Sequence, residues 1–125
     1  MSKLIIVMLG GALGSGSRYL LASWVQKISN SPYFPYGTLA VNLIGCLLIG
    51  LITGLAANKV YFTTQTRSFI LIGFLGGFTT FSTFSNETFA LITDTQYLTA
   101  AINITASVIL GLLGVWIGQS LSNTL

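Results

Sequence analysis

Four long apolar stretches occupy almost the whole of this 125-residue sequence. An α-helix needs about 20 largely apolar residues to cross the hydrocarbon core of a bilayer. The connections between the stretches, such as "KISNSPYFP" and "DTQY", are short and polar or aromatic. The pattern therefore predicts an all-α membrane protein with four transmembrane helices, in which consecutive helices run antiparallel. The predicted spans, which make up a single four-span domain over 1–125, are approximately 4–26, 37–58, 68–93 and 98–120.

The composition excludes several other classes of protein. Charged residues make up 6% of the chain, whereas soluble domains carry about 25%, and so few charges cannot form the basic face that binds nucleic acid. The chain has no histidine and one cysteine, Cys46, which lies in an apolar run and is interpreted as a packing residue. Zinc, haem and iron–sulfur centres therefore lack their usual ligands, and Ser-His-Asp or Cys-His catalysis lacks a base. The sequence points away from enzymes.

The basic residues give only a weak preference for one orientation in the membrane. With four spans, Lys3, Lys59 and Arg67 fall on the side of the termini, while Lys27 falls on the opposite side, with Arg18 close to it. Because loop lysines and arginines set orientation through the positive-inside rule, this small excess predicts a chain that can insert both ways.

Pairs of glycines recur at four-residue spacing within the spans. In lipid, such small residues let helix backbones approach closely, which supplies much of the association energy. Four short helices have little interior of their own, so the sequence predicts a homo-oligomer in which any pathway for a solute is shared between subunits. The pairs are Gly10 and Gly14, Gly50 and Gly54, Gly73 and Gly77, and Gly114 and Gly118.

Polar residues inside three of the spans are candidate functional residues. Arg18 either extends to the interface, gives positive potential near a vestibule, or fixes neighbouring backbone carbonyls. Thr38 and Asn42 lie four residues apart on one helix face, as do Thr99, Asn103 and Ser107 in the fourth span. Each stripe of hydrogen-bond donors is either interhelical glue or the lining of a polar path.

The third span contains the unusual stretch "GFLGGFTTFSTF", from residue 73 to residue 84. Gly76 and Gly77 each lower helix propensity by about 1 kcal/mol, and β-branched and aromatic residues follow, so we expect the third helix to be broken within the membrane. Backbone carbonyls at such a break are hard ligands that can hold Na⁺. Beyond the break, Phe81 and Phe84 share a helix face, and their positive ring edges could meet an anion, although core or lipid packing is the common role of such residues.

Glu87 lies one turn beyond Phe84 in the same span. It could couple transport to protons, pair with Arg18, or lie at the interface. Asn86 to Thr88 match a glycosylation sequon, but the site would lie in the membrane rather than in a surface loop.

Three motifs in this order resemble the Fluc family of fluoride channels, also called CrcB. They are "GGALGSGSRYLL" in the first span, "GTLAVNLIG" in the second and "GFLGGFTTFSTFSNET" in the third, and the resemblance covers nearly the whole chain. It implies an antiparallel dual-topology homodimer that lets fluoride leave the cytoplasm passively through two pores at the subunit interface. The chain would then be an integral protein of a bacterial inner membrane. Its partners would be the lipid bilayer, fluoride and a second copy of the chain.

The resemblance also implies roles for individual residues. Phe81 and Phe84 would be the pore phenylalanines, Asn42 the pore asparagine and Arg18 the arginine of the first span. Hydroxyls of a polar track would come from Ser82, Thr83 and Ser107, and Thr38 would also line the pore. A structural Na⁺ at the dimer centre would be held by the backbone carbonyls of Gly76 and Thr79. Asn103 stands where some members have an aromatic residue, which leaves the contribution of the fourth span open.

A small proton-coupled exporter of drugs or cations is the main alternative function. Such an exporter needs a membrane-embedded carboxylate, for which Glu87 is the sole candidate, whereas the only charge in the interior of the first span is the positive Arg18. A purely structural membrane subunit is a further alternative, but packing alone would not require the two stripes of donors.

Overall fold

The computed structural model describes residues 2–58 and 62–124, and all the regular secondary structure in that part of the chain is helical. Lys59, one of the residues in the orientation argument, lies outside the described residues. Each predicted apolar stretch falls within one long helix or interrupted helix, and all four are long and apolar enough to cross a membrane. The elements are α1 (Ser2–Ser29), α2 (Tyr36–Asn58), α3 (Thr64–Arg67), the π-helical segment η1 (Ser68–Leu75), α4 (Gly76–Phe78), α5 (Phe81–Thr93) and α6 (Tyr97–Ser122).

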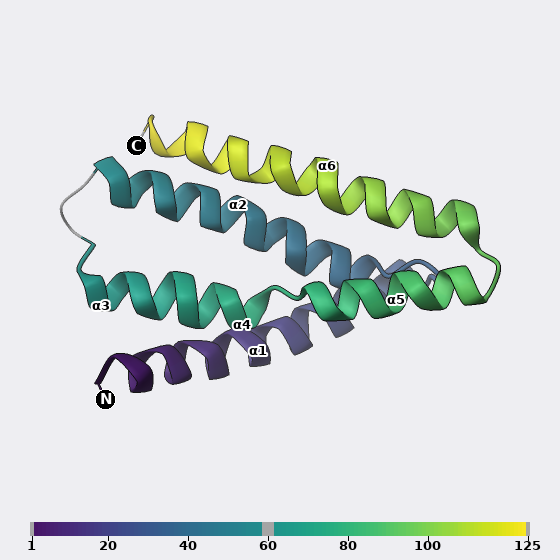
Figure 1. Cartoon of the computed structure of the whole chain (residues 1–125), viewed down its shortest axis with the longest axis horizontal. Coiled ribbons are helices and arrows are strands. Elements are labelled where there is room, and N and C mark those ends of the chain that lie inside the picture. The colour runs from purple at the N-terminus through teal and green to yellow at the C-terminus, as the bar shows by residue number, and fades with distance from the viewer. Residues whose placement is uncertain (1, 59–61, 125) are drawn as a thin grey trace.

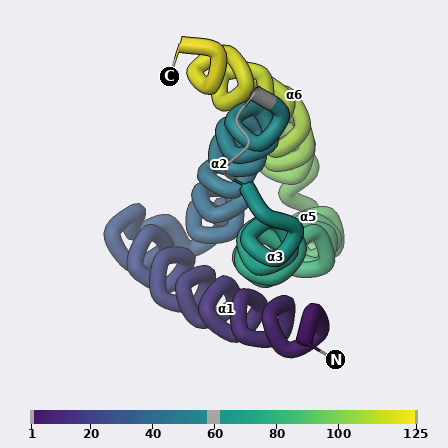
Figure 2. Tube along the Cα trace, turned by 90° about the vertical axis from the view of Figure 1, so that its left-hand side faces the viewer, coloured from purple at the N-terminus to yellow at the C-terminus, as the bar shows by residue number. Residues whose placement is uncertain are grey.

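The helices form an elongated bundle in which both termini lie at the same end (Figure 1). The connection between α5 and α6 lies at the opposite end. Seen along the bundle, α1 and α6 are the outer helices, with α2 and the third, interrupted helix between them (Figure 2). The most extensive contacts join α2 to α6 and α1 to η1. This order brings the interruption of the third helix next to the middle of α1 and α2.

The paired glycines pack helices together within this one chain. A Cβ added at Gly14 of α1 would overlap the backbone carbonyl of Phe74 in η1, and one added at Gly50 of α2 would overlap the carbonyl of Val115 in α6. The backbones therefore approach so closely that only glycine fits at these two positions. The spacing that indicated close packing is used inside the protomer, so by itself it carries no information about oligomerisation.

The third helix is interrupted at Thr79 and Thr80 rather than at its glycine pair. Both threonines have extended backbones, with φ −84° and ψ 159° at Thr79 and φ −152° and ψ 120° at Thr80. Gly76 and Gly77 remain helical in α4, and a Cβ on Gly77 would crowd the backbone of Gly11 in α1. The expected break thus exists, but the glycines precede it and Gly77 serves close packing instead.

Candidate functional site

The side chain of Asn42 holds the interruption of the third helix through two hydrogen bonds. Its Oδ1 accepts from the backbone N–H of Thr80 at 2.8 Å, and its Nδ2 donates to the backbone carbonyl of Thr80 at 3.0 Å. Asn42 projects from α2, which passes beside the break. Extended backbone inside a membrane helix needs such partners because unsatisfied amide groups are costly in lipid. Asn42, which was predicted as a hydrogen-bond donor, therefore also satisfies the backbone N–H and carbonyl of Thr80 at the break.

Thr80 begins α5 as its N-cap residue. Its hydroxyl accepts from the backbone N–H of Thr83 at 3.3 Å and donates to the hydroxyl of Thr83 at 3.0 Å, with the Ser82 hydroxyl 3.4 Å away. Threonine is a favourable N-cap because its oxygen satisfies one of the exposed amides of the first turn. The hydroxyls of Ser82 and Thr83, both predicted to line the polar track, are exposed in the first turn of α5.

Arg18 reaches the same interruption from α1. Its Nη1 lies 3.4 Å from the backbone carbonyl oxygen of Thr79, to which it donates. The half-buried guanidinium thus fixes a backbone carbonyl, which is one of the roles considered for it from the sequence. Gly76, the other residue predicted to hold Na⁺, is exposed, and no heavy atom of the described chain lies within 4 Å of where its Cβ would stand.

Phe81 and Phe84 lie together at the start of α5. Their ring centroids are 5.7 Å apart and the ring planes are inclined by 45°. Phe81 is 79% exposed in the single chain, so its ring faces away from the protomer's own core. Phe81 also borders an apolar groove of about 340 Å³ next to the interruption, together with Asn42, Gly76, Thr79 and Thr80.

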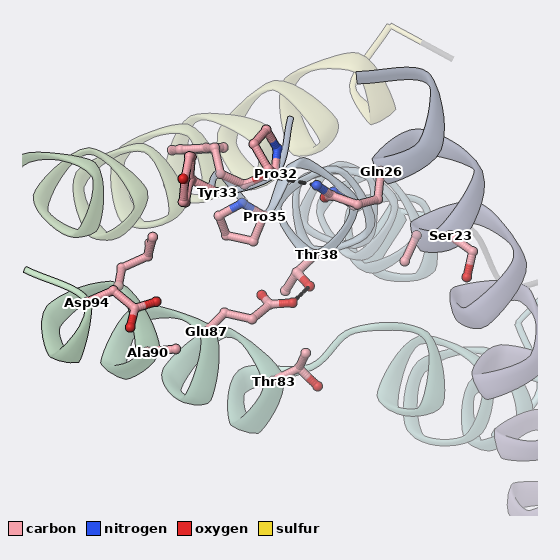
Figure 3. A pocket seen from close by; sticks show the side chains of 14 residues that line it. Ser23, Gln26, Pro32, Tyr33, Pro35, Thr38, Thr83, Glu87, Ala90 and Asp94 are labelled. Carbon is pink, nitrogen blue, oxygen red and sulfur yellow. Dashed lines mark hydrogen bonds between the residues drawn. The ribbon is translucent and has the colours of Figure 1, made fainter. Parts of the chain in front are cut away.

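A second cavity, of about 540 Å³, lies between α1, the α1–α2 connection, α2 and α5. Figure 3 shows Thr38 on α2 beside Glu87 on α5 at the wall of this cavity, with Thr83 one turn before Glu87. The Thr38 hydroxyl donates to Oε1 of Glu87 at 2.8 Å, while Oε2 is buried with no hydrogen-bond partner among the described residues. The partner of Glu87 is therefore Thr38, whereas Arg18, its suggested partner, is bound to Thr79.

The polar residues of α6 do not meet at one site in the single chain. Asn103 is 1% exposed and donates to the hydroxyl of Thr88 at 2.9 Å, which ties α6 to α5. Thr99 donates to Gln96 in the turn before it. The Ser107 hydroxyl is buried and has no hydrogen-bond partner within the described part of the chain. None of the three lines either of the cavities described above.

Sequence reasoning missed three residues that organise these sites. Thr80 could have been found as an N-cap, since it directly precedes the helical run from Phe81. Thr88 relays the hydrogen bond of Asn103 to the carbonyl of Phe84. Gln26, at the end of the first predicted span, binds the carbonyls of Ser31 and Phe34 and the N–H of Gly37, and so shapes the wall of the larger cavity. Nothing in the sequence pattern marks Gln26.

Comparisons with known proteins cover nearly the full length of the chain. The model of the family described as "CrcB-like protein, Camphor Resistance (CrcB)" matches residues 5–119. A protein of Geobacter metallireducens named "Fluoride-specific ion channel FluC" is 48% identical over 118 residues, 94% of each chain. Proteins of the same name from Citrifermentans bemidjiense and Nitratidesulfovibrio vulgaris are 46% and 40% identical, covering 100% and 97% of each chain.

The family match begins in the first long helix and ends in the fourth. Its range includes the interrupted third helix and the two residues that bind the interruption, Arg18 and Asn42. The protein is an integral membrane protein with four spans and bacterial homologues. The chain belongs to the CrcB family, whose curated members named above are fluoride-specific ion channels.

Proposed function

We propose that this protein is a fluoride channel of a bacterial inner membrane that lets fluoride leave the cytoplasm passively. The observation that carries the proposal is the 46–48% identity, over nearly the full length, to proteins named as fluoride-specific ion channels. Fluoride is small and strongly hydrated, so a pore must replace water with donors while holding the ion weakly enough for release. The interruption of the third helix offers donors of this kind.

The fluoride-contacting groups would come from the start of α5 and from the helices beside it. The Asn42 amide has a second N–H beyond the one used by the Thr80 carbonyl, and the hydroxyls of Ser82 and Thr83 are exposed nearby. Phe81 and Phe84 would present the positive edges of their rings. Arg18 would add positive potential, and Thr38 and Ser107 would extend the polar track on either side.

The pores would form between two copies of the chain in an antiparallel dual-topology homodimer. Phe81, which is 79% exposed, and Gly76, which has open space in front of it, lie at the interruption of the third helix. A partner packed over this region would bury Phe81 and convert an open groove into an enclosed path. Each copy would be a single four-span unit, and the weak charge bias of the loops allows both orientations.

A structural Na⁺ would lie at the centre of this dimer, held by the backbone carbonyls of Gly76 and Thr79 from each copy. The residues present fit such an ion: carbonyl oxygens are hard ligands suited to Na⁺ at discontinuous membrane helices, and the extended backbone of Thr79 takes its carbonyl out of the helical ladder. Among the described residues, no three His, Cys, Asp or Glu side chains come together as a metal site, so the carbonyls are the natural ligands here. Bound Na⁺ would neutralise these carbonyl dipoles and link the two interruptions.

Ion efflux from liposomes containing the purified protein tests the channel function. We expect rapid fluoride release with little chloride release from the wild type, and slower fluoride release from Phe81→Ile and Asn42→Ala. Phe89→Ile is the matched control, because Phe89 is an exposed phenylalanine on the same helix outside the ring pair. Wild-type protein that released no more fluoride than empty liposomes would refute the proposal, and proton-driven uptake of an organic cation would instead favour an exporter.

A further inference from the structure

The hydrogen bond from the Thr80 N–H to Asn42 leaves the carbonyl of Gly76, in the third helix, without its regular backbone donor. In an α-helix each N–H donates to the carbonyl four residues earlier. The N–H of Thr79 still follows this rule and donates to Leu75 at 3.0 Å. The next N–H, that of Thr80, would reach the carbonyl of Gly76 in a continuous helix, but it donates to Oδ1 of Asn42 at 2.8 Å instead.

Asn42 thus removes the regular donor of the Gly76 carbonyl, one proposed Na⁺ ligand. It also holds Thr80, the residue that follows the second proposed ligand, Thr79. With its regular donor diverted, the Gly76 carbonyl keeps its lone pairs available for another ligand. The second bond, from Nδ2 to the Thr80 carbonyl, keeps Thr80 extended, so the preceding carbonyl of Thr79 also stays outside the ladder. The Gly76 oxygen therefore depends on one side chain that is not itself a proposed ligand. The Thr79 oxygen depends on Asn42 less directly, because the Thr83 N–H donates to the Thr80 hydroxyl instead and Arg18 also donates to this oxygen.

We infer that Asn42 is a positioning residue for the Na⁺ site, which it creates by capturing the backbone of Thr80. The inference rests on the proposed function, since it concerns the Na⁺ named there. It is separate from any contact of Asn42 with fluoride, because the two hydrogen bonds involve the Thr80 backbone alone. Without the Asn42 side chain, the Thr80 N–H is free to donate to the Gly76 carbonyl as in a continuous helix. A cation must then compete with that hydrogen bond for the carbonyl oxygen. Partners that orient metal ligands typically affect affinity by about 10- to 100-fold.

Thermal unfolding of the purified full-length protein, in buffers without fluoride, gives a direct readout. NaCl replaces choline chloride at constant ionic strength. Binding to the folded state adds RT ln(1 + [Na⁺]/Kd) to the free energy of unfolding, so the Na⁺ concentration above which this free energy begins to rise with the logarithm of [Na⁺] reports the affinity of the folded protein for Na⁺. We expect this concentration to rise about tenfold or more in Asn42→Ala. Asn103→Ala is the matched control, because it removes another asparagine that bonds a neighbouring helix, away from the interruption, and its Na⁺ dependence should equal that of the wild type.

The outcomes separate this inference from the proposed function. Wild-type protein whose stability did not depend on Na⁺ would remove the proposed Na⁺ site itself. A Na⁺-dependent wild type together with an unchanged Na⁺ dependence in Asn42→Ala would overturn the inference alone. If Asn42→Ala does not fold, hydrogen exchange of the wild-type Thr80 amide decides the matter: Na⁺ should slow it at least severalfold relative to choline, and equal exchange in both salts would contradict the inference.

Discussion

The hydroxyl of Thr38 on α2 donates a 2.8 Å hydrogen bond to Oε1 of Glu87 on α5. Thr38 is only 7% exposed, and the other carboxylate oxygen is buried without a hydrogen-bond partner in the part of the chain that the structure describes. A half-buried carboxyl group with so few donors depends strongly on each one. This contact therefore couples the start of α2 to the helix that carries the phenylalanine pair.

Replacing Thr38 with valine should destabilise the protein by about 1–3 kcal/mol, because the half-buried Glu87 side chain then loses its donor while its Oε2 stays buried. It should also slow fluoride efflux, since the hydrogen-bonded pair of Thr38 and Glu87 lines the larger cavity. Unfolding in detergent and efflux from liposomes measure the two effects. Thr38→Ser keeps the hydroxyl and should retain most of both properties; a serine variant as impaired as the valine variant would show that the methyl group, not the hydrogen bond, matters.

Glycines 14 and 16 in α1 should respond oppositely to alanine. The new methyl group in Gly14→Ala would overlap the Phe74 carbonyl, and overpacking of this kind destabilises by about 1–3 kcal/mol. In Gly16→Ala the methyl group meets no heavy atom of the described chain within 4 Å, so the higher helix propensity of alanine should leave stability unchanged or raise it by up to about 1 kcal/mol. Equal unfolding free energies for the two variants would contradict the close approach of α1 and η1.

Asn103 and Thr88 should behave as an energetically coupled pair. Thr88→Val leaves the buried Asn103 amide without its hydroxyl acceptor and should destabilise by about 1–3 kcal/mol. Combining it with Asn103→Leu removes both polar partners, so the double variant should be more stable than the sum of the single effects predicts, by about 1 kcal/mol. A double-mutant cycle of unfolding free energies measures this coupling, and strict additivity would argue against the hydrogen bond between α5 and α6.

Arg18 should influence fluoride flux mainly through its charge. Arg18→Gln should slow fluoride efflux about tenfold, because local positive potential raises anion concentration and entry rate, whereas Arg18→Lys should keep most of the flux. Lys27→Gln provides the control, since Lys27 is an exposed cation near the end of the same helix and its removal should change little. An unimpaired Arg18→Gln channel would mean that the arginine serves only to fix the Thr79 carbonyl.

Much of the fold could be predicted from local features of the sequence. Runs of about 20 apolar residues are diagnostic because a membrane helix must satisfy its own backbone and match the bilayer thickness. The ends of α1 and α6 extend a few residues beyond the predicted spans, since hydropathy marks the apolar part of a helix rather than its last hydrogen bond. The π-helical geometry from Ser68 to Leu75 was not foreseen, because its residues are as apolar as those of an ordinary helix.

The candidate site could be predicted only in part. Asn42, Arg18, Phe81 and Phe84 stand out as unusual residues within apolar spans, or through their resemblance to a known family. The partners of such polar residues could not be predicted. The contact of Asn42 with Thr80 spans 38 positions in the chain, and that of Thr38 with Glu87 spans 49. Such pairings depend on which helix faces meet, and spacing within one helix does not specify this.

By itself, the sequence determined that this is a four-helix membrane protein of the CrcB type with a weak point in its third helix, because span length, charge scarcity and local motifs are all properties of neighbouring residues. Only the tertiary structure decided that the helix opens at Thr79 and Thr80 while Gly76 and Gly77 remain helical. The physical reason is that a buried N–H can leave the helical ladder only where another acceptor replaces the lost carbonyl, and Asn42 of α2 provides that acceptor to Thr80.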